Sequence, residues 1–143
     1  MLEYHSAPTA DLPALTLYAI LRLRVDVFVV EQECAYPELD GRDVEPTAIQ
    51  FWATDGTEVA ATLRLLSDGP DRRIGRVATA VSARGKGVAA ELMRRALDLC
   101  EGQTVRLDAQ AHLAGWYARF GFATDGPEFL EDGIPHVPMI RTA

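Results

Sequence analysis

A glycine-rich turn in the second half of the chain has the composition of an anion-binding site. Arg84, Gly85, Lys86 and Gly87 follow a run of small residues and lead directly into an amphipathic segment of helical period. The first amides of a helix have no partner inside the helix, and the helix dipole makes that end positive, so it attracts anions. The turn therefore predicts a phosphate or diphosphate site, although an exposed turn with incidental basic residues has the same pattern.

The turn differs from two common nucleotide-binding motifs. The pattern G-x-x-x-x-G-K-[ST] is absent, and the G-x-G-x-x-G fingerprint of dinucleotide-binding proteins is broken at Ala90. An ATPase and a nicotinamide-dependent dehydrogenase are therefore not expected.

The elements that must position this turn alternate between strands and helices. Residues 48–66 change to a period of two around Asp55-Gly56, which predicts a β-hairpin. One apolar stripe over residues 88–100 predicts the main amphipathic helix, closed by Gly102. The other expected elements are a strand at 2–6, helices at 12–24 (capped by Asp11) and 25–32, a loop at 36–46, strands at 73–80 and 105–109, a helix at 113–120 and an edge strand or hairpin at 129–141. This order predicts an α+β fold with a mixed sheet.

Composition limits the partners that the protein can have. The chain has 143 residues, 48% of them hydrophobic, which predicts a single domain over residues 1–143. Asp and Glu number 21 against 14 Lys and Arg, and this net charge of −7 disfavours nucleic acids and anionic membranes as partners. Cys34 and Cys100 do not have the spacing of metal ligands, so no metal is expected. Two cysteines without a disulfide pattern, together with the lack of an apparent signal peptide or membrane span, favour a cytoplasmic protein.

Three motifs in order resemble those of the GCN5-related N-acetyltransferase (GNAT) family. Residues 84–89 match the pyrophosphate loop R-x-x-G-x-A, residues 117–122 match Y-x-x-x-G-F, and residues 24–32 match R-x-x-V-F-x-x-E-Q. Segments 75–77, 109–113 and 131–136 are similar to the ElaA-like branch of that family. The resemblance spans nearly the whole chain. It implies a central, mixed, mostly antiparallel and splayed sheet flanked by helices, and an enzyme that moves an acetyl group from acetyl-CoA to a small-molecule or peptide amine.

The resemblance also implies which residues bind the acetyl donor. The pantetheine arm would pair with the backbone of one strand, an amide near Ala78 or Thr79 would bond the thioester carbonyl, and the loop amides would surround the pyrophosphate. The expected donor-binding residues are Val77, Ala78, Thr79, Arg84, Gly85, Lys86, Gly87, Val88, Ala89 and Gln110, the last where many family members have asparagine.

Acyl transfer to an amine needs two proton movements, for which the sequence offers several groups. Tyr117 matches the family tyrosine that protonates the leaving thiolate, but it could instead pack beside Trp116 and Phe120. The sequence does not decide which residue is the general base, and Glu33 and His136 are the residues expected to act in catalysis beside Tyr117. The candidates for the base are Glu31, Glu33, His112 and His136, each of which could also be an ordinary surface, capping or structural residue.

The acceptor side has weaker signals. The acid-rich residues 31–45 could attract a cationic amine, and Phe28, Tyr36 and Trp52 could line its pocket, although a solvated loop and core packing are the more common explanations. An edge strand at Val137–Arg141 could meet a second copy of the chain in a homodimer.

Two other classes of function remain open. One is a CoA-binding sensor or interaction module without transferase activity, which release of thiol in the presence of amines would separate from an enzyme. The other is an interaction domain without a nucleotide ligand, for which acetyl-CoA would not shift the melting temperature.

Overall fold

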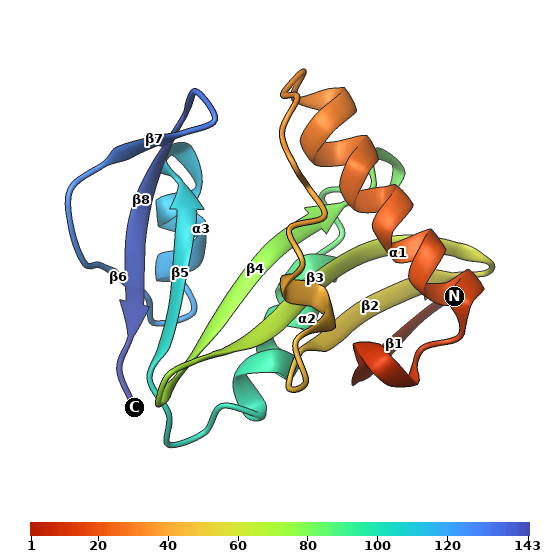
Figure 1. The fold of residues 1–143 in the computed structure, drawn as a ribbon, viewed down its shortest axis with the longest axis horizontal. Coiled ribbons are helices and arrows are strands. Elements are labelled where there is room, and N and C mark those ends of the chain that lie inside the picture. The colour runs from red at the N-terminus through yellow and green to blue at the C-terminus, as the bar shows by residue number, and fades with distance from the viewer.

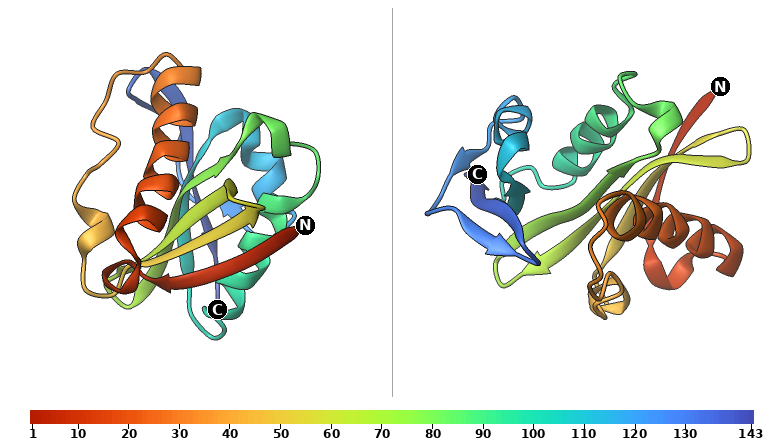
Figure 2. Two further views of the ribbon diagram at one scale, coloured as in Figure 1. Left: turned by 90° about the vertical axis from the view of Figure 1, so that its right-hand side faces the viewer. Right: turned by 90° about the horizontal axis from the view of Figure 1, so that it is seen from above.

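A computed structural model describes residues 1–143, which form one eight-stranded sheet with helices on both faces. The strand order is β1-β2-β3-β4-β5-β8-β6, with β7 paired to β8. α1 covers one face of the sheet, and α2 and α3 lie on the other (Figures 1 and 2). The strands are β1 (Leu2–Pro8), β2 (Ile49–Asp55), β3 (Glu58–Asp68), β4 (Asp71–Thr79), β5 (Val105–Gln110), β6 (Ala123–Thr124), β7 (Phe129–Glu131) and β8 (Ile134–Arg141); the helices are α1 (Ala14–Val25), α2 (Val88–Asp98) and α3 (Ala114–Ala118).

The sheet opens between its two central strands. All neighbouring strands are antiparallel except β4 and β5, which pair in parallel only at Arg72↔Val105 and Arg73↔Arg106. Beyond these residues, β4 continues along β3 and β5 continues along β8, so the two strands diverge (Figure 1). Two strand edges then face each other without a sheet partner. The mixed, mostly antiparallel and splayed sheet is thereby confirmed.

α2 is the helix that the apolar stripe predicts. Leu92, Met93 and Ala96 are fully buried against the sheet, in a core cluster that also contains Phe51 and Leu63. Replacing a buried leucine such as Leu92 by alanine typically costs about 2–5 kcal/mol. The packing of α2 therefore fixes the position of its amino end relative to β4.

The first helix differs in its start from the sequence expectation. Asp11 lies in a 3₁₀ turn (Thr9–Asp11), and the extended Leu12 and Pro13 separate it from Ala14, where α1 begins. Its carboxylate makes no capping bond, so the predicted cap is wrong. The second helical piece is confirmed as a π-helical turn over Asp26–Glu31, a form that is frequent at functional sites.

The end of the chain forms the expected hairpin, but not an edge strand. β8 pairs with β5 on one side and with β6 and β7 on the other, and the Asp125 amide donates to the Pro138 carbonyl between them. Since both edges of Val137–Arg141 are occupied, the expectation of a homodimer through this edge loses its basis.

None of the helices has the length and apolar character needed to cross a membrane.

Candidate active site

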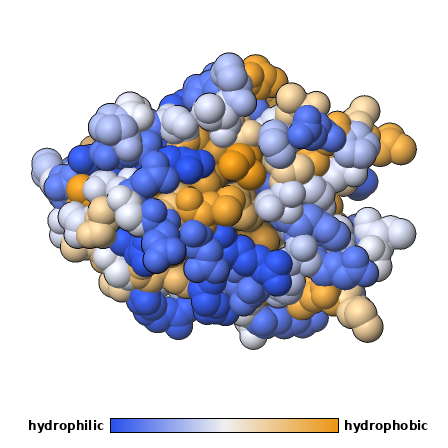
Figure 3. Space-filling model, turned by 90° about the horizontal axis from the view of Figure 1, so that it is seen from below, coloured by the Kyte–Doolittle hydropathy of each residue, from blue (hydrophilic) through white to orange (hydrophobic).

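A cleft of about 1340 Å³ occupies the opening between β4 and β5. Its walls come from the π-helical turn, β4, the loop before α2, β5, α3 and the β7–β8 turn. Seen from below, the molecule has a hollow whose centre is hydrophobic and whose surroundings are hydrophilic (Figure 3). Of the donor-binding residues expected from the sequence, those that line the cleft are Val77, Ala78, Thr79, Arg84, Gly85, Gly87, Val88, Ala89 and Gln110.

The loop before α2 leaves backbone amides open toward the cleft. Gly85 and Gly87 have φ angles of 78° and 73°, a left-handed conformation that glycine adopts without strain. Gly87 is the N-cap of α2, and no side chain accepts a bond from this end of the helix. The amides of Val88 and Ala89 therefore have neither a helical nor a side-chain partner, which is the arrangement that binds anions.

The two cations of this loop are placed differently from the sequence expectation. Arg84 forms a two-pronged ion pair with Glu31, with both N–O distances 2.6 Å, and its Nε donates to the Thr79 carbonyl. Lys86 is exposed and does not line the cleft. The structure therefore brings the loop backbone to the cleft. Arg84 is already paired with Glu31 there, and the Lys86 side chain lies outside the cleft lining.

β4 contains a bulge where it borders the cleft. Arg64 and Thr62 of β3 pair with Gly75 and Ala78, so β4 has one extra residue at this point. Arg76 has a φ of 53°, which is uncommon for a residue with a side chain. The bulge was not apparent in the sequence, because no glycine or proline marks the left-handed position.

Tyr117 lies on α3 and lines the cleft with only 8% of its surface exposed. Its ring packs edge-on against Trp116 and Phe122. Burial raises the pKa of Tyr117 to about 12, so the hydroxyl keeps its proton at neutral pH. A protonated phenol in a cleft wall can donate a hydrogen bond or a proton.

The segment after the π-helical turn is hydrogen-bonded to β5 and to the β7–β8 turn, on the opposite side of the cleft from β4. Gln32 accepts a bond of 3.2 Å from the Gln110 amide on β5, and the Cys34 thiol donates to the Asp132 carbonyl in the β7–β8 turn at 3.4 Å. Together with Glu31, which binds Arg84, these residues connect the segment to three walls of the cleft. Gln110 thus contacts another side chain in this structure, and neither Gln32 nor Cys34 was assigned a contact from the sequence.

The four candidate bases are spread over different places. His136 and His112 line the cleft, Glu31 lies at its rim in the pair with Arg84, and Glu33 is exposed outside the lining. Hydrogen bonds from Arg84 lower the pKa of Glu31, which weakens this carboxylate as a base.

His136 is nine-tenths buried and its ring has a defined environment. The ring stacks on Phe129, Nδ1 lies 2.7 Å from the Ile134 carbonyl oxygen, and Nε2 lies 3.6 Å from the Glu131 carboxylate. A carbonyl oxygen only accepts hydrogen bonds, so Nδ1 must carry the proton. In the neutral ring Nε2 is then the nitrogen that can accept one.

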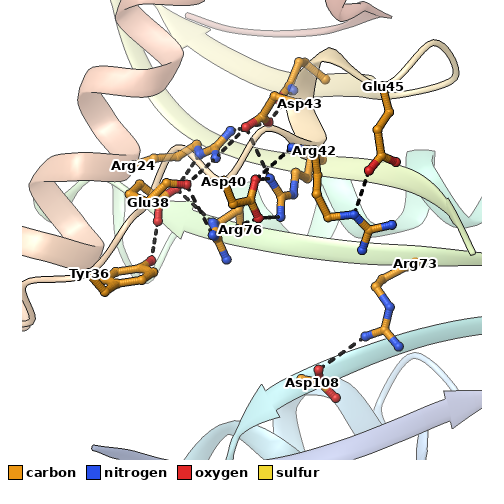
Figure 4. Close-up of polar contacts among 12 residues, drawn as sticks. Arg24, Tyr36, Glu38, Asp40, Arg42, Asp43, Glu45, Arg73, Arg76 and Asp108 are labelled. Atoms are coloured by element: carbon orange, nitrogen blue, oxygen red, sulfur yellow. Dashed lines mark hydrogen bonds and ion pairs between the residues drawn. The ribbon is translucent and has the colours of Figure 1, made fainter. Parts of the chain in front are cut away.

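The acid-rich loop forms buried ion pairs rather than an attractive surface for a cation (Figure 4). Arg24 is fully buried and binds Glu38 at 2.7 Å and Asp43 at 2.6 Å. Arg64 binds Asp40 with two bonds of 2.7 and 2.8 Å and Asp43 at 3.2 Å. These carboxylates are neutralised, so the idea that they attract the amine is not supported by the structure.

Of the three aromatic residues suggested for an amine pocket, two lie at the cleft. Phe28 and Tyr36 line it, and the Tyr36 hydroxyl donates to Glu38 while the Arg76 guanidinium lies 5.6 Å from the ring centre. Trp52 instead stacks on His5 away from the cleft. No group of three or more His, Cys, Asp and Glu side chains has an arrangement that could hold a metal ion.

Comparison with known proteins points to one family. Residues 24–143 match the family model described as an acetyltransferase (GNAT) domain. The UPF0039 protein Rv2851c of Mycobacterium tuberculosis is 52% identical over 136 residues, which cover 92% of this chain and 87% of that protein. The crystal structure of an acyl-CoA N-acyltransferase from Pseudomonas aeruginosa is 41% identical, with a TM-score of 0.95 over 99% of this chain and all of that one. Escherichia coli ElaA is 36% identical, with a TM-score of 0.93 over 99% of both chains.

Proposed function

The chain belongs to the GNAT family of N-acetyltransferases, and we propose that it moves an acetyl group from acetyl-CoA to a primary amine by direct attack of the amine on the thioester. One observation carries the proposal. The unpaired edge of β4, the open amides at the start of α2 and the Tyr117 side chain all line a single cleft.

The donor is proposed to bind along β4 and at the start of α2. The pantetheine arm would pair with the backbone of Val77, Ala78 and Thr79, where the sheet has no strand on that side. The amides of Val88 and Ala89 would bind the diphosphate. The backbone supplies most of this recognition, which suits a loop in which Arg84 is already paired.

Thr79 is the better of the two candidates for bonding the thioester carbonyl. The Ala80 amide donates to the Ala60 carbonyl in β3, and successive residues of a strand direct their backbone groups to opposite sides. The amide of Thr79 therefore points toward the cleft, as does its carbonyl, to which Arg84 donates. An amide in this place would stabilise negative charge that develops on the thioester oxygen.

Tyr117 is proposed as the general acid. The leaving thiolate would resemble a cysteine thiolate, with a pKa near ~8.5 in water. Because Tyr117 remains protonated, it can donate to the sulfur as negative charge develops there.

His136 is proposed as the general base in preference to Glu33. An alkyl ammonium has a pKa near ~10.4 and must lose a proton before it attacks. The Nε2 atom of His136 can accept this proton, and the Glu131 carboxylate 3.6 Å away stabilises the resulting imidazolium. Glu33 could act only through intervening water, since it does not line the cleft.

A thiol-release assay with acetyl-CoA and a panel of small amines and peptide amines tests the proposal. Release that depends on the amine and falls in the Tyr117→Phe variant supports acetyl transfer. Binding of acetyl-CoA without any amine-dependent release would instead support a CoA-binding sensor. Absence of binding, measured by calorimetry, would contradict both functions.

A further inference from the structure

The arginines of the cleft differ in their partners. Five of the six that line it form an ion pair with a carboxylate, and Arg119 forms none. The paired arginines and their partners are Arg42 with Glu45, Arg64 with Asp40 and Asp43, Arg73 with Asp68 and Asp108, Arg76 with Glu38 and Asp40, and Arg84 with Glu31. Asp and Glu outnumber Lys and Arg by seven in this chain, so a guanidinium without a carboxylate partner in the cleft is an exception.

Arg119 lies at the end of α3, on the rim of the cleft. It is exposed, and its guanidinium lies 6.0 Å from the centre of the Trp116 ring. Trp116 is half-buried and packs edge-on against the rings of Tyr117 and Phe120. An indole and the guanidinium that lies over its ring, which has no carboxylate partner, therefore line the cleft together.

This pair lines the same cleft as the start of α2. Ala89 and Ala90, in the first turn of α2, line the cleft along with Trp116 and Arg119. A CoA thioester carries anionic groups at two places, the diphosphate and the 3′-phosphate of its ribose. The open amides of α2 suit the diphosphate, and Arg119 is the arginine of the cleft lining that has no carboxylate partner and can bind the 3′-phosphate.

We propose that Arg119 binds the 3′-phosphate of the donor's adenosine and that Trp116 stacks against its adenine, so that the protein selects 3′-phosphorylated CoA donors. A guanidinium can donate two parallel hydrogen bonds to phosphate oxygens, and a purine has a flat face that an indole can cover. The proposal rests on the proposed function, because it assumes that a CoA ester occupies the cleft.

The test compares binding of CoA and of 3′-dephospho-CoA by isothermal titration calorimetry. The unmodified protein is expected to bind CoA about tenfold more tightly, as one charge-assisted hydrogen-bonded contact provides. Arg119→Gln should lose this difference by weakening CoA binding alone, and Arg119→Lys should restore part of it. Arg22→Gln, which removes an exposed arginine of α1 that is also unpaired and lies outside the cleft, serves as the matched control.

The outcomes separate the two proposals. Equal affinity of the unmodified protein for the two ligands would overturn the role of Arg119, as would an Arg119→Gln variant that weakens both ligands equally. Either result would leave acetyl transfer standing. Binding of neither ligand would instead contradict the proposed function itself.

Discussion

The carboxylate of Glu31 accepts two hydrogen bonds of 2.6 Å from the guanidinium of Arg84. This pair joins the end of the π-helical turn to the loop at the start of α2, across 53 positions of sequence. Both side chains are 41% exposed. The cation that the motif places at the diphosphate is thus already paired with a carboxylate.

Removing the charge of Glu31 should therefore strengthen donor binding. The variant Glu31→Gln takes a negative charge away from the loop and leaves Arg84 free to bind phosphate, so the Kd for CoA should fall about threefold, the scale of an exposed ion pair. Calorimetry with CoA measures this, with Glu33→Gln as a control for a nearby exposed carboxylate. A weaker affinity in Glu31→Gln would mean that Glu31 holds Arg84 in its binding position.

Tyr117→Phe should reduce turnover about a hundredfold, within the range of general acid catalysis. The phenyl ring preserves the packing against Trp116 and Phe122, so the folding stability and the Kd for acetyl-CoA should change little. Steady-state kinetics and thermal unfolding provide the two measurements. A loss of less than about tenfold would assign Tyr117 to packing rather than catalysis.

His136→Gln should lower kcat about a hundredfold and change the Kd for acetyl-CoA little, because the group that accepts the amine proton is lost. His112→Gln is the matched comparison, since both histidines line the cleft but only the Nδ1 atom of His136 is fixed by a carbonyl. If kcat falls in the His112 variant and is unchanged in the His136 variant, the assignment is reversed.

Gly87→Ala should weaken acetyl-CoA binding by more than its effect on stability explains. A Cβ at Gly87 would meet no atom of the protein within 4 Å, but φ is +73°, which costs an alanine about 1–2 kcal/mol. Gly102→Ala introduces the same strain at a φ of +79° in open space beyond α2. Chemical unfolding should show similar losses of folding stability for the two variants, while calorimetry should show weaker binding of acetyl-CoA only for Gly87→Ala. Equal binding by both would remove the loop from the donor site.

The ion pair between Asp40 and Arg64 should make stability depend on acidic pH. Hydrogen bonds from Arg64 hold the pKa of Asp40 well below its usual range. The folded carboxyl therefore binds a proton less tightly than the unfolded one, whose pKa is about 3.9, so its contribution is complete above about pH 4 and is lost as the pH falls further. Between neutral and acidic pH, the free energy of unfolding measured with urea should fall less in Asp40→Asn than in the unmodified chain. In Asp98→Asn, at an exposed position without an ion pair, the free energy of unfolding should fall as much as in the unmodified chain.

Local patterns predicted most of the elements. The stripe of α2, the hairpin of β2 and β3 and the glycine loop each lie within a short stretch of sequence, so their periodicity and turn residues were sufficient. The expected cap at Asp11 was wrong because the 3₁₀ turn and Pro13 displace the start of α1. Of the two alternatives expected at 129–141, the hairpin is confirmed and the edge strand is not, because β5, β6 and β7 occupy both sides of β8, and sequence shows no partner across a sheet.

The sequence by itself determined where the chain presents open amides to an anion, because glycine conformations and the unpaired start of a helix depend on neighbouring residues only. Only the tertiary structure decided which charged groups near those amides are free. Glu31 neutralises Arg84, three arginines neutralise the acidic loop, and Arg119 has no such partner. The interaction between two charges depends on their separation in space, and it is the fold that sets this separation.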